Sequence, residues 1–143
     1  MTPPRHIEAG AYYLLTRNTT QRQFWLKPCA MVVQVFGYCL AYAAARHSID
    51  VLAVCVMSSH FHAVIFDPTG QLPRFLHWLN QFVAKCLNVH WKRRENLFES
   101  RQTSVQRLGS REDVERFIAY CILNPVTAGV VPRSKMWPGL CSR

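Results

Sequence analysis

The chain has 143 residues, the length of one domain that buries roughly 70% of the surface its unfolded form exposes. Half of the residues are apolar and 17% are charged, which excludes a disordered chain. Lys and Arg number 17 against 8 Asp and Glu, and the resulting net charge of +9 favours a nucleic acid or an anionic membrane surface as partner, unless it serves solubility alone.

The first half of the chain predicts a strand, a long helix and a hairpin. Aromatic and β-branched residues from Gly10 to Arg17 predict the first strand. Frequent Ala, Leu, Val and Met from about Phe24 to His47 predict a helix. The apolar runs Val51–Met57 and His60–Phe66 predict two strands, and the two residues between them favour a hairpin.

The second half predicts a helix, a strand and a last helix. Apolar residues spaced three and four apart from Pro73 to Trp91 predict an amphipathic helix, and residues 96–108 fit a fourth strand. Ser110 begins a segment that resembles a capping box, and its helix runs through Tyr120 until Pro125 stops it. This order predicts one α+β domain over residues 1–143: a ferredoxin-like βαββαβ antiparallel sheet with two helices on one face and an extra C-terminal helix carrying the tyrosine.

The cysteines and the N-terminus indicate a reduced, cytoplasmic protein. Six cysteines form no CxxC pair, and most lie in apolar runs where a thiol packs as a small hydrophobe. Residues 1–10 lack the apolar core and cleavage site of a secretory signal. The apolar stretch Cys29–Ala45 holds Gln34 and reaches only about 17 residues, the bottom of the spanning range, so we expect a core helix.

Two histidines form a candidate metal site. On an extended strand, side chains two apart share a face, so His60 and His62 project together. Neutral imidazoles are common ligands for transition metals, and with an oxygen ligand they also suit the harder ions of phosphate chemistry. The competing interpretation is a pair of ordinary strand histidines.

A tyrosine and an asparagine form the second candidate pair. Tyr120 and Asn124 are four apart on the last predicted helix, so they share a face. A phenol ordinarily titrates near pH 10, so it attacks phosphorus at neutral pH only with help. A metal on the two histidines could supply that help, with the Asn124 amide oxygen as third ligand. Alternatively, Tyr120 is a core aromatic and Asn124-Pro125 a simple helix stop.

These motifs together resemble a known family. The string Met57 to His62 resembles the Met-Pro-Asn-His-hydrophobic-His motif of single-tyrosine HUH transposases, with Ser58-Ser59 in place of Pro-Asn. The string Tyr120 to Val131 resembles the motif Tyr-Ile-His-Leu-Asn-Pro-Val-Arg-Ala-Gly-Leu-Val of the REP-associated tyrosine transposases, with Thr127 at the arginine. Residues 96–101 are similar to that family's Leu-Phe/Trp-Gln-Gly-Arg segment, and residues 10–18 to its first strand.

The resemblance implies a function. His60, His62 and Asn124 would hold Mg²⁺ or Mn²⁺ against the scissile phosphate of a palindromic, REP-like hairpin or single-stranded DNA. Tyr120 would attack, giving a 5′-phosphotyrosine intermediate and a free 3′-hydroxyl that can reverse the reaction in strand transfer. The resemblance also implies a homodimer, because two domains would handle two DNA ends, and a nucleoid-associated location.

Charged and polar side chains outside the core are expected to contact DNA, with phosphate contacts that weaken as salt rises. The candidates are Arg17, Asn18, Lys92, Arg93, Arg94, Arg101, Gln102 and Arg107, followed by Arg111. Basic residues at a helix end are also common solvated caps. Trp78, Trp91 and Trp137 could stack on bases or be buried.

Two other functions remain open at this stage. One is a non-catalytic module that holds hairpin DNA or RNA on a ferredoxin-like sheet, as RNA-recognition domains do. It predicts salt-sensitive binding that EDTA does not change. The other is a peripheral membrane protein that uses the Cys29–Ala45 helix, which predicts solubility that depends on detergent. We expect no membrane partner.

Overall fold

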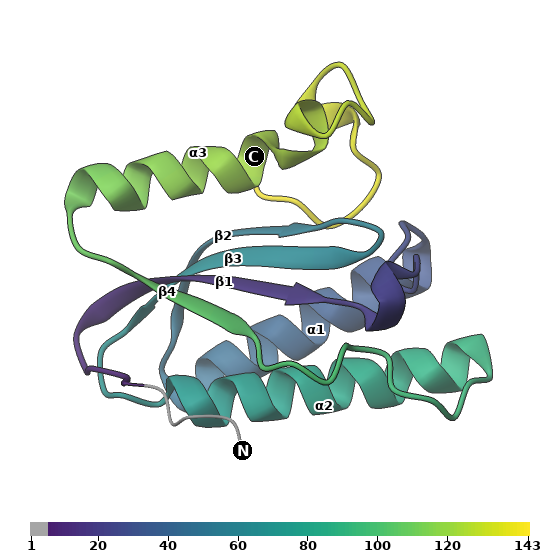
Figure 1. Cartoon of the computed structure of the whole chain (residues 1–143), viewed down its shortest axis with the longest axis horizontal. Helices are drawn as coiled ribbons and strands as arrows, with labels where there is room; N and C mark the ends of the chain where they lie inside the picture. Colours follow the sequence, from purple (N-terminus) through teal and green to yellow (C-terminus); the bar gives the residue numbers. More distant parts are fainter. Residues whose placement is uncertain (1–5) are drawn as a thin grey trace.

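The computed structural model describes residues 6–143. These residues form one four-stranded sheet, and Figure 1 shows helices on both sides of it. Residues 1–5, part of the segment in which no export signal is expected, lie outside the described residues. The predicted order of elements is confirmed, with 3-10 turns at Thr20–Arg22 and Ser134–Met136: β1 (Ala11–Asn18), α1 (Ala30–His47), β2 (Asp50–Val56), β3 (His60–Asp67), α2 (Leu72–Trp91), β4 (Ser104–Leu108) and α3 (Arg111–Thr127).

The sheet has the ferredoxin-like arrangement that the sequence predicts. Its strand order is β2-β3-β1-β4, and each neighbouring pair is antiparallel. Met57 N donates to His60 O at 2.8 Å, which closes the predicted hairpin between β2 and β3. The register pairs Thr16 of β1 with His62 of β3, and Asn18 with His60. The histidines therefore lie on a central strand, close to the β2–β3 turn and beside the C-terminal end of β1.

The two faces of the sheet are covered by different helices. Figure 1 shows α1 and α2 side by side on one face and α3 on the other. Phe61, Ala63 and Ile65 of β3 belong to the large apolar core on the α1/α2 side. Val64 belongs to a smaller cluster with residues of α3. Because side chains alternate along a strand, His60 and His62 share the α3 face with Val64.

The start of α1 differs from the prediction. The helix begins at Ala30 and not near Phe24, because Gln21 and Arg22 have positive φ angles of 51° and 52° and Cys29 is extended. Leu26 N donates to Ser58 O at 2.9 Å. Tertiary contacts of the segment before α1 thus override the helical composition of its sequence.

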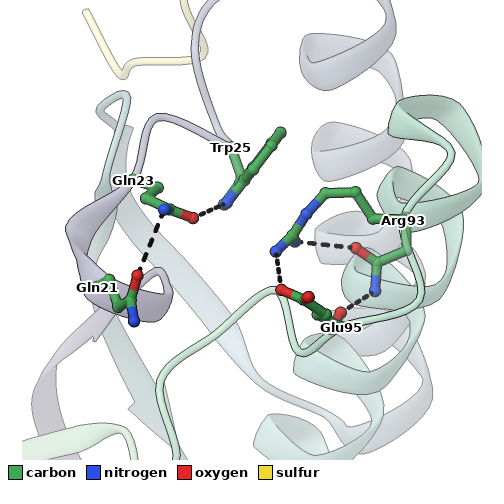
Figure 2. A network of polar contacts seen from close by, with 6 residues as sticks. Gln21, Gln23, Trp25, Arg93 and Glu95 are labelled. Carbon is green, nitrogen blue, oxygen red and sulfur yellow. Dashed lines mark hydrogen bonds and ion pairs between the residues drawn. The ribbon is translucent and has the colours of Figure 1, made fainter.

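Side-chain contacts tie this segment to the end of α2, as Figure 2 shows. Trp25 Nε1 donates to Gln23 Oε1 at 2.8 Å. The Arg93 guanidinium lies 4.0 Å from the centre of the Trp25 ring and 3.4 Å from Glu95 Oε2. These contacts fix the loop that leads from β1 to α1 close to the turn after α2.

Two further boundaries differ. β4 covers only Ser104–Leu108 of the predicted 96–108, and Phe98 forms a single bridge with Thr19. The Ser110 cap is confirmed, since its Oγ accepts from Asp113 N at 3.1 Å. The prediction that Pro125 stops the last helix is wrong, because α3 continues through it to Thr127.

Pro125 is tolerated inside α3 because the backbone carbonyl that it leaves without a hydrogen-bond donor from the helix lies close to a side chain of another segment. Proline lacks the N–H that would bond the carbonyl four residues earlier, here that of Cys121. The Cys141 thiol lies 3.7 Å from this oxygen. The C-terminal segment therefore supports α3 close to Asn124.

The cysteines are free thiols, and most pack as predicted. Cys39, Cys55 and Cys121 are buried, and burial raises the pKa of Cys39 to about 11 and that of Cys121 to about 12. Within residues 6–143, none of the helices has the length and apolar character needed to cross a bilayer. The stretch Cys29–Ala45 instead contributes Val32, Phe36 and other side chains to the core.

Candidate active site

His60 and His62 form a pair on the α3 face of β3. Their ring centroids are 4.8 Å apart. His62 is 6% exposed, whereas His60 is half-buried. The alternation of the strand thus brings the two imidazoles together, as the sequence predicts, and leaves one of them open to solvent.

Neighbouring hydroxyls orient both rings. Thr16 Oγ1 lies 2.9 Å from His62 Nδ1, and Ser59 Oγ lies 3.2 Å from His60 Nδ1. When the Nδ1 atoms hydrogen-bond in this way, the Nε2 lone pairs remain for a ligand. Neither hydroxyl was singled out from the sequence, although the pairing of Thr16 with His62 follows once the register of β1 and β3 is known.

The surroundings favour neutral imidazoles. Burial, and after it the neighbouring His60, lower the pKa of His62 to about 4. The pKa of His60 is lowered by burial and then by Arg22, while a hydrogen bond with Asn124 opposes the change. Because only the neutral form of an imidazole binds a metal, the lowered pKa values of both histidines favour the form that can act as a ligand at neutral pH.

Helix α3 brings Tyr120 to the same place. The ring centroids of Tyr120 and His62 are 5.1 Å apart, in an edge-to-face arrangement, and Phe117 packs against Tyr120 at 6.0 Å. The tyrosine is 39% exposed, so it is not a core aromatic. The next residue, Cys121, is fully buried and anchors this turn of the helix on the sheet.

Asn124 lies one turn further along α3 and is 7% exposed. Its amide approaches His60 closely enough to influence the pKa of that ring. Its Oδ1 is buried but makes no hydrogen bond of normal geometry. Leaving a buried acceptor unpaired costs about 1–3 kcal/mol, so this atom is suited to a ligand that completes the site.

The donor set fits a hard divalent cation with open coordination positions. Two imidazole nitrogens and one amide oxygen supply three ligands, and water or phosphate oxygens can supply the rest. Among residues 6–143 there is no cluster of three or more His, Cys, Asp or Glu side chains suited to a metal.

Arg22 is a basic residue of this site that the sequence did not reveal. It follows β1 in the 3-10 turn Thr20–Arg22 and is exposed. Two hydrogen bonds of Thr19 to Ser59 O, 2.9 Å from the backbone and 3.1 Å from the side chain, hold this turn beside the start of β3. The positive φ angles of residues 21 and 22, invisible in sequence, bring the guanidinium towards His60.

Three of the predicted DNA contacts meet at one hollow. Arg17, Arg101 and Gln102 line a cavity of about 660 Å³ between α2 and residues 96–103. The Arg17 guanidinium donates to the backbone carbonyls of Glu99 (2.9 Å) and Arg101, so it shapes the wall of this cavity. Asn18 Nδ2 donates to Glu99 Oε1 at 3.3 Å. The cavity therefore adjoins the end of β1 that faces His60.

The other predicted contacts are scattered. Lys92 and Arg94 are exposed at the end of α2, whereas the Arg93 side chain is only 12% exposed and lies between Trp25 and Glu95. Arg107 forms an ion pair with Glu8 at 3.1 Å. Lys92 and Arg94 therefore extend an exposed basic surface, whereas the exposed Arg107 has its charge paired with that of Glu8.

The three tryptophans considered for base stacking also differ in how far they are buried and bonded within the protein. Trp137 is buried and its Nε1 donates to Val56 O at 3.0 Å. Trp91 donates to Trp25 O at 3.0 Å and packs beside that ring. Trp78 stands between two other rings on the outer surface of the helices. Only Trp78 is placed where a base could approach a group of rings.

Comparison with solved structures shows which proteins share this fold. A REP-associated tyrosine transposase solved with a bound REP hairpin matches 97% of this chain and 81% of its own, with a TM-score of 0.76 and 16% identity. A candidate transposase from Deinococcus radiodurans R1 matches 87% of this chain and 97% of its own, with a TM-score of 0.56 and 22% identity. No protein-family model and no curated protein matches the sequence.

The chain is therefore an α+β protein with the fold of these transposases. At such identities the likeness establishes the arrangement of the elements, including the helix that follows β4. The chemistry must be argued from the side chains of this chain.

Proposed function

We propose that this protein is a single-tyrosine HUH endonuclease and strand transferase of the REP-associated kind, which nicks single-stranded or hairpin DNA. The observation that carries the proposal is the convergence of Tyr120 and the histidine pair, with 5.1 Å between the rings of Tyr120 and His62. Two motifs separated by more than fifty residues of sequence meet at a partly exposed point of a basic chain. An arrangement of ordinary core residues would leave neither the phenol nor His60 open to solvent.

His60, His62 and Asn124 would hold the divalent cation, Mg²⁺ or Mn²⁺. When bound, such an ion acts as a Lewis acid that offsets the charge developing on the phosphate oxygens. The residues of the chain support this role in two ways: burial favours the neutral imidazoles, and the buried Oδ1 of Asn124 lies near His60 without a hydrogen bond of normal geometry.

Tyr120 would supply the nucleophile. Its phenol oxygen gives up its proton and forms a bond with phosphorus, while the bond from phosphorus to the 3′-oxygen breaks. That oxygen takes up a proton and leaves as a 3′-hydroxyl, and the 5′-phosphate stays on Tyr120. Because one phosphodiester is exchanged for another, the reverse reaction can join the 3′-hydroxyl of the same or another strand without ATP.

Arg22 would bind the phosphate next to the reacting group. It is an exposed cation close to His60, and guanidinium groups match phosphate oxygens in charge and geometry. The DNA strand would continue from there past Asn18 to the cavity lined by Arg101 and Gln102, and Lys92 and Arg94 would contact more distant phosphates.

A single copy of the chain would carry all the residues needed to cut the DNA strand. Tyr120 and both histidines belong to the same chain, so the tyrosine would act in its own site. A homodimer stays a prediction for the handling of two DNA ends. Analytical ultracentrifugation with and without hairpin DNA tests it: a 16.5 kDa species without DNA, and a complex of one protein chain with one hairpin in its presence, contradict the dimer and leave the nicking proposal intact.

The decisive test is a covalent adduct. A labelled hairpin with a single-stranded 5′ flank is incubated with protein and Mn²⁺, and the products are separated on a denaturing gel. We expect a protein–DNA adduct that EDTA prevents and that Tyr120→Phe lacks. Tyr12→Phe is the matched control, because Tyr12 is another partly exposed tyrosine, on β1.

Two results would contradict the proposal. An equal adduct from Tyr120→Phe would exclude Tyr120 as nucleophile. Salt-sensitive binding that ignores EDTA, with no adduct under any condition, would favour the non-catalytic DNA- or RNA-binding module.

A further inference from the structure

Four aromatic rings form a row on the outer surface of α1 and α2. Tyr38 and Tyr42 of α1 are stacked at 6.2 Å between ring centroids. Tyr42 stacks on Trp78 of α2 at 4.8 Å, and Trp78 stacks on Phe82 at 4.4 Å. We call these four side chains the aromatic row. Figure 1 shows that both helices lie on the side of the sheet opposite α3.

Two rings of the aromatic row pack against the protein core, and the other two are exposed to solvent. Trp78 and Phe82 are partly buried and pack against the main core. Tyr38 is 69% exposed and Tyr42 is 43% exposed. The rings are four residues apart on each helix, so they follow one side of each helix. Two exposed tyrosine rings are thus held in fixed positions by two rings anchored in the protein.

Basic side chains lie at both ends of the row. Lys85 Nζ is 6.0 Å from the centre of the Phe82 ring. Arg46 follows Tyr42 by four residues and Arg74 precedes Trp78 by four, so each lies one helical turn from that ring pair. Both also lie near His47, whose pKa is lowered first by burial and then by these two cations. The sequences of α1 and α2 contain no Asp or Glu. The surface is therefore aromatic in the middle, cationic at its ends, and without a carboxylate on either helix.

Folding alone does not account for this composition. Exposed tyrosines bury little surface in the monomer, and clustered exposed rings mark contact surfaces. The flanking cations would add little to the binding of an apolar protein surface. They attract a polyanion, and neither helix has a carboxylate that would repel it. Bases that are not paired can stack on aromatic rings while Lys and Arg neutralise the phosphates.

We propose that the aromatic row with Arg46, Arg74 and Lys85 binds unpaired nucleotides of single-stranded nucleic acid. This surface lies across the sheet from Tyr120, so it is a second binding surface and does not depend on the nicking reaction. A base stacks on Tyr38, the outermost ring of the row, which Tyr42 supports from the other side, and the flanking cations hold the neighbouring phosphates. A strand bound there stays attached to the protein while another segment occupies the α3 face.

The test is the affinity for a short labelled oligothymidine, measured by fluorescence anisotropy in EDTA so that no strand is cut. The Tyr38→Ala/Tyr42→Ala double variant changes exposed residues only, and its thermal unfolding is recorded beside that of the parent. We expect its affinity to fall about tenfold, since one stacked base contributes about 1–3 kcal/mol. Tyr12→Ala, on the other face of the sheet, leaves the affinity unchanged, and duplex DNA shows no difference between the variants.

A second measurement locates the contact directly. Oligonucleotides carrying 5-iodouracil are cross-linked to the parent protein by ultraviolet light, and the modified peptides are identified by mass spectrometry. Cross-links to Tyr38, Tyr42 or Trp78 are the expected result. Parent-like affinity of the double variant, or cross-links only outside the row, overturns the proposal.

Two other outcomes also overturn it by assigning the row to a different partner. The variant could lose binding to phosphatidylserine vesicles and keep its affinity for oligothymidine, which indicates a membrane surface. It could instead change the sedimentation coefficient at equal oligothymidine affinity, which indicates contact between two copies of the chain. Neither outcome affects the adduct expected from Tyr120, so the two proposals fail separately.

Discussion

The two faces of the sheet are built for different tasks. On the α1/α2 face, large apolar side chains such as Phe36, Phe61 and Phe75 are fully buried. On the α3 face the apolar cluster is small, and a cavity of about 600 Å³ lies between the sheet and the first half of α3. The same face holds Asn124 with an unpaired buried oxygen. The α1/α2 face therefore supplies most of the apolar packing, and the α3 face carries the partly exposed polar side chains on which the proposed reaction depends.

The largest expected difference between the α1/α2 face and the α3 face is in the free energy of unfolding that a substitution removes. Phe36→Ala removes a fully buried ring that packs on Phe61 at 4.9 Å, and we expect a loss of about 3–5 kcal/mol in the free energy of unfolding. Tyr120→Phe is expected to change it by less than about 0.5 kcal/mol and to abolish the adduct. Urea denaturation followed by circular dichroism measures both. Similar losses for the two variants would refute the division of tasks.

The next effect is a dependence of stability on pH that comes from the α3 face. The pKa of His62 is about 4 in the folded protein and near 6.5 when unfolded, a difference of roughly 3 kcal/mol at 1.36 kcal/mol per unit. A lowered pKa means that the unfolded chain binds the proton first. The contribution is therefore complete above pH 6.5 and is lost as the pH falls towards 4.

Urea denaturation at pH 7 and pH 4.5 checks this expectation. His62→Gln, which cannot be protonated, should reduce the difference between the two pH values. His90→Gln is a control on an exposed histidine and should leave the difference as it is. If His62→Gln keeps the full difference, another group causes the acid sensitivity.

A smaller effect concerns Asn124. Replacing it with leucine, which has a similar volume, removes the unpaired buried oxygen, and we expect the free energy of unfolding to stay within about 1 kcal/mol of the parent or to rise. The same change should weaken Mn²⁺ binding roughly tenfold or more. Isothermal titration calorimetry of the protein without DNA measures the affinity. Unchanged Mn²⁺ affinity would remove Asn124 from the ligand set.

The smallest expected effect is that of Arg22. Arg22→Ala should lower the rate of adduct formation about tenfold, equivalent to about 1.4 kcal/mol, with little change in stability because the side chain is exposed. Arg133→Ala, which removes an exposed arginine beyond α3, is the control and should retain the parent rate. Equal rates for the two variants would show that proximity to His60 gives Arg22 no role.

The sequence by itself determined the features that depend on local periodicity. The alternation of a strand puts His60 and His62 on one face, the spacing of four puts Tyr120 and Asn124 on one side of a helix, and Ser110 caps that helix as its position predicts. The order of strands and helices likewise follows from residue patterns, because each element is recognisable from its own residues. Together these patterns were enough to predict the sheet and to choose the candidate residues.

Only the tertiary structure decided which of these elements and side chains come into contact. The face that α3 covers, and hence the approach of Tyr120 to His62, depends on packing between segments far apart in the chain. The continuation of α3 through Pro125 depends on a neighbouring thiol, and the place of Arg22 beside His60 depends on a turn with positive φ angles. The aromatic row likewise exists only because two helices lie side by side. These contacts join residues that are far apart in the sequence. Local periodicity describes only neighbouring residues, so it could not predict them.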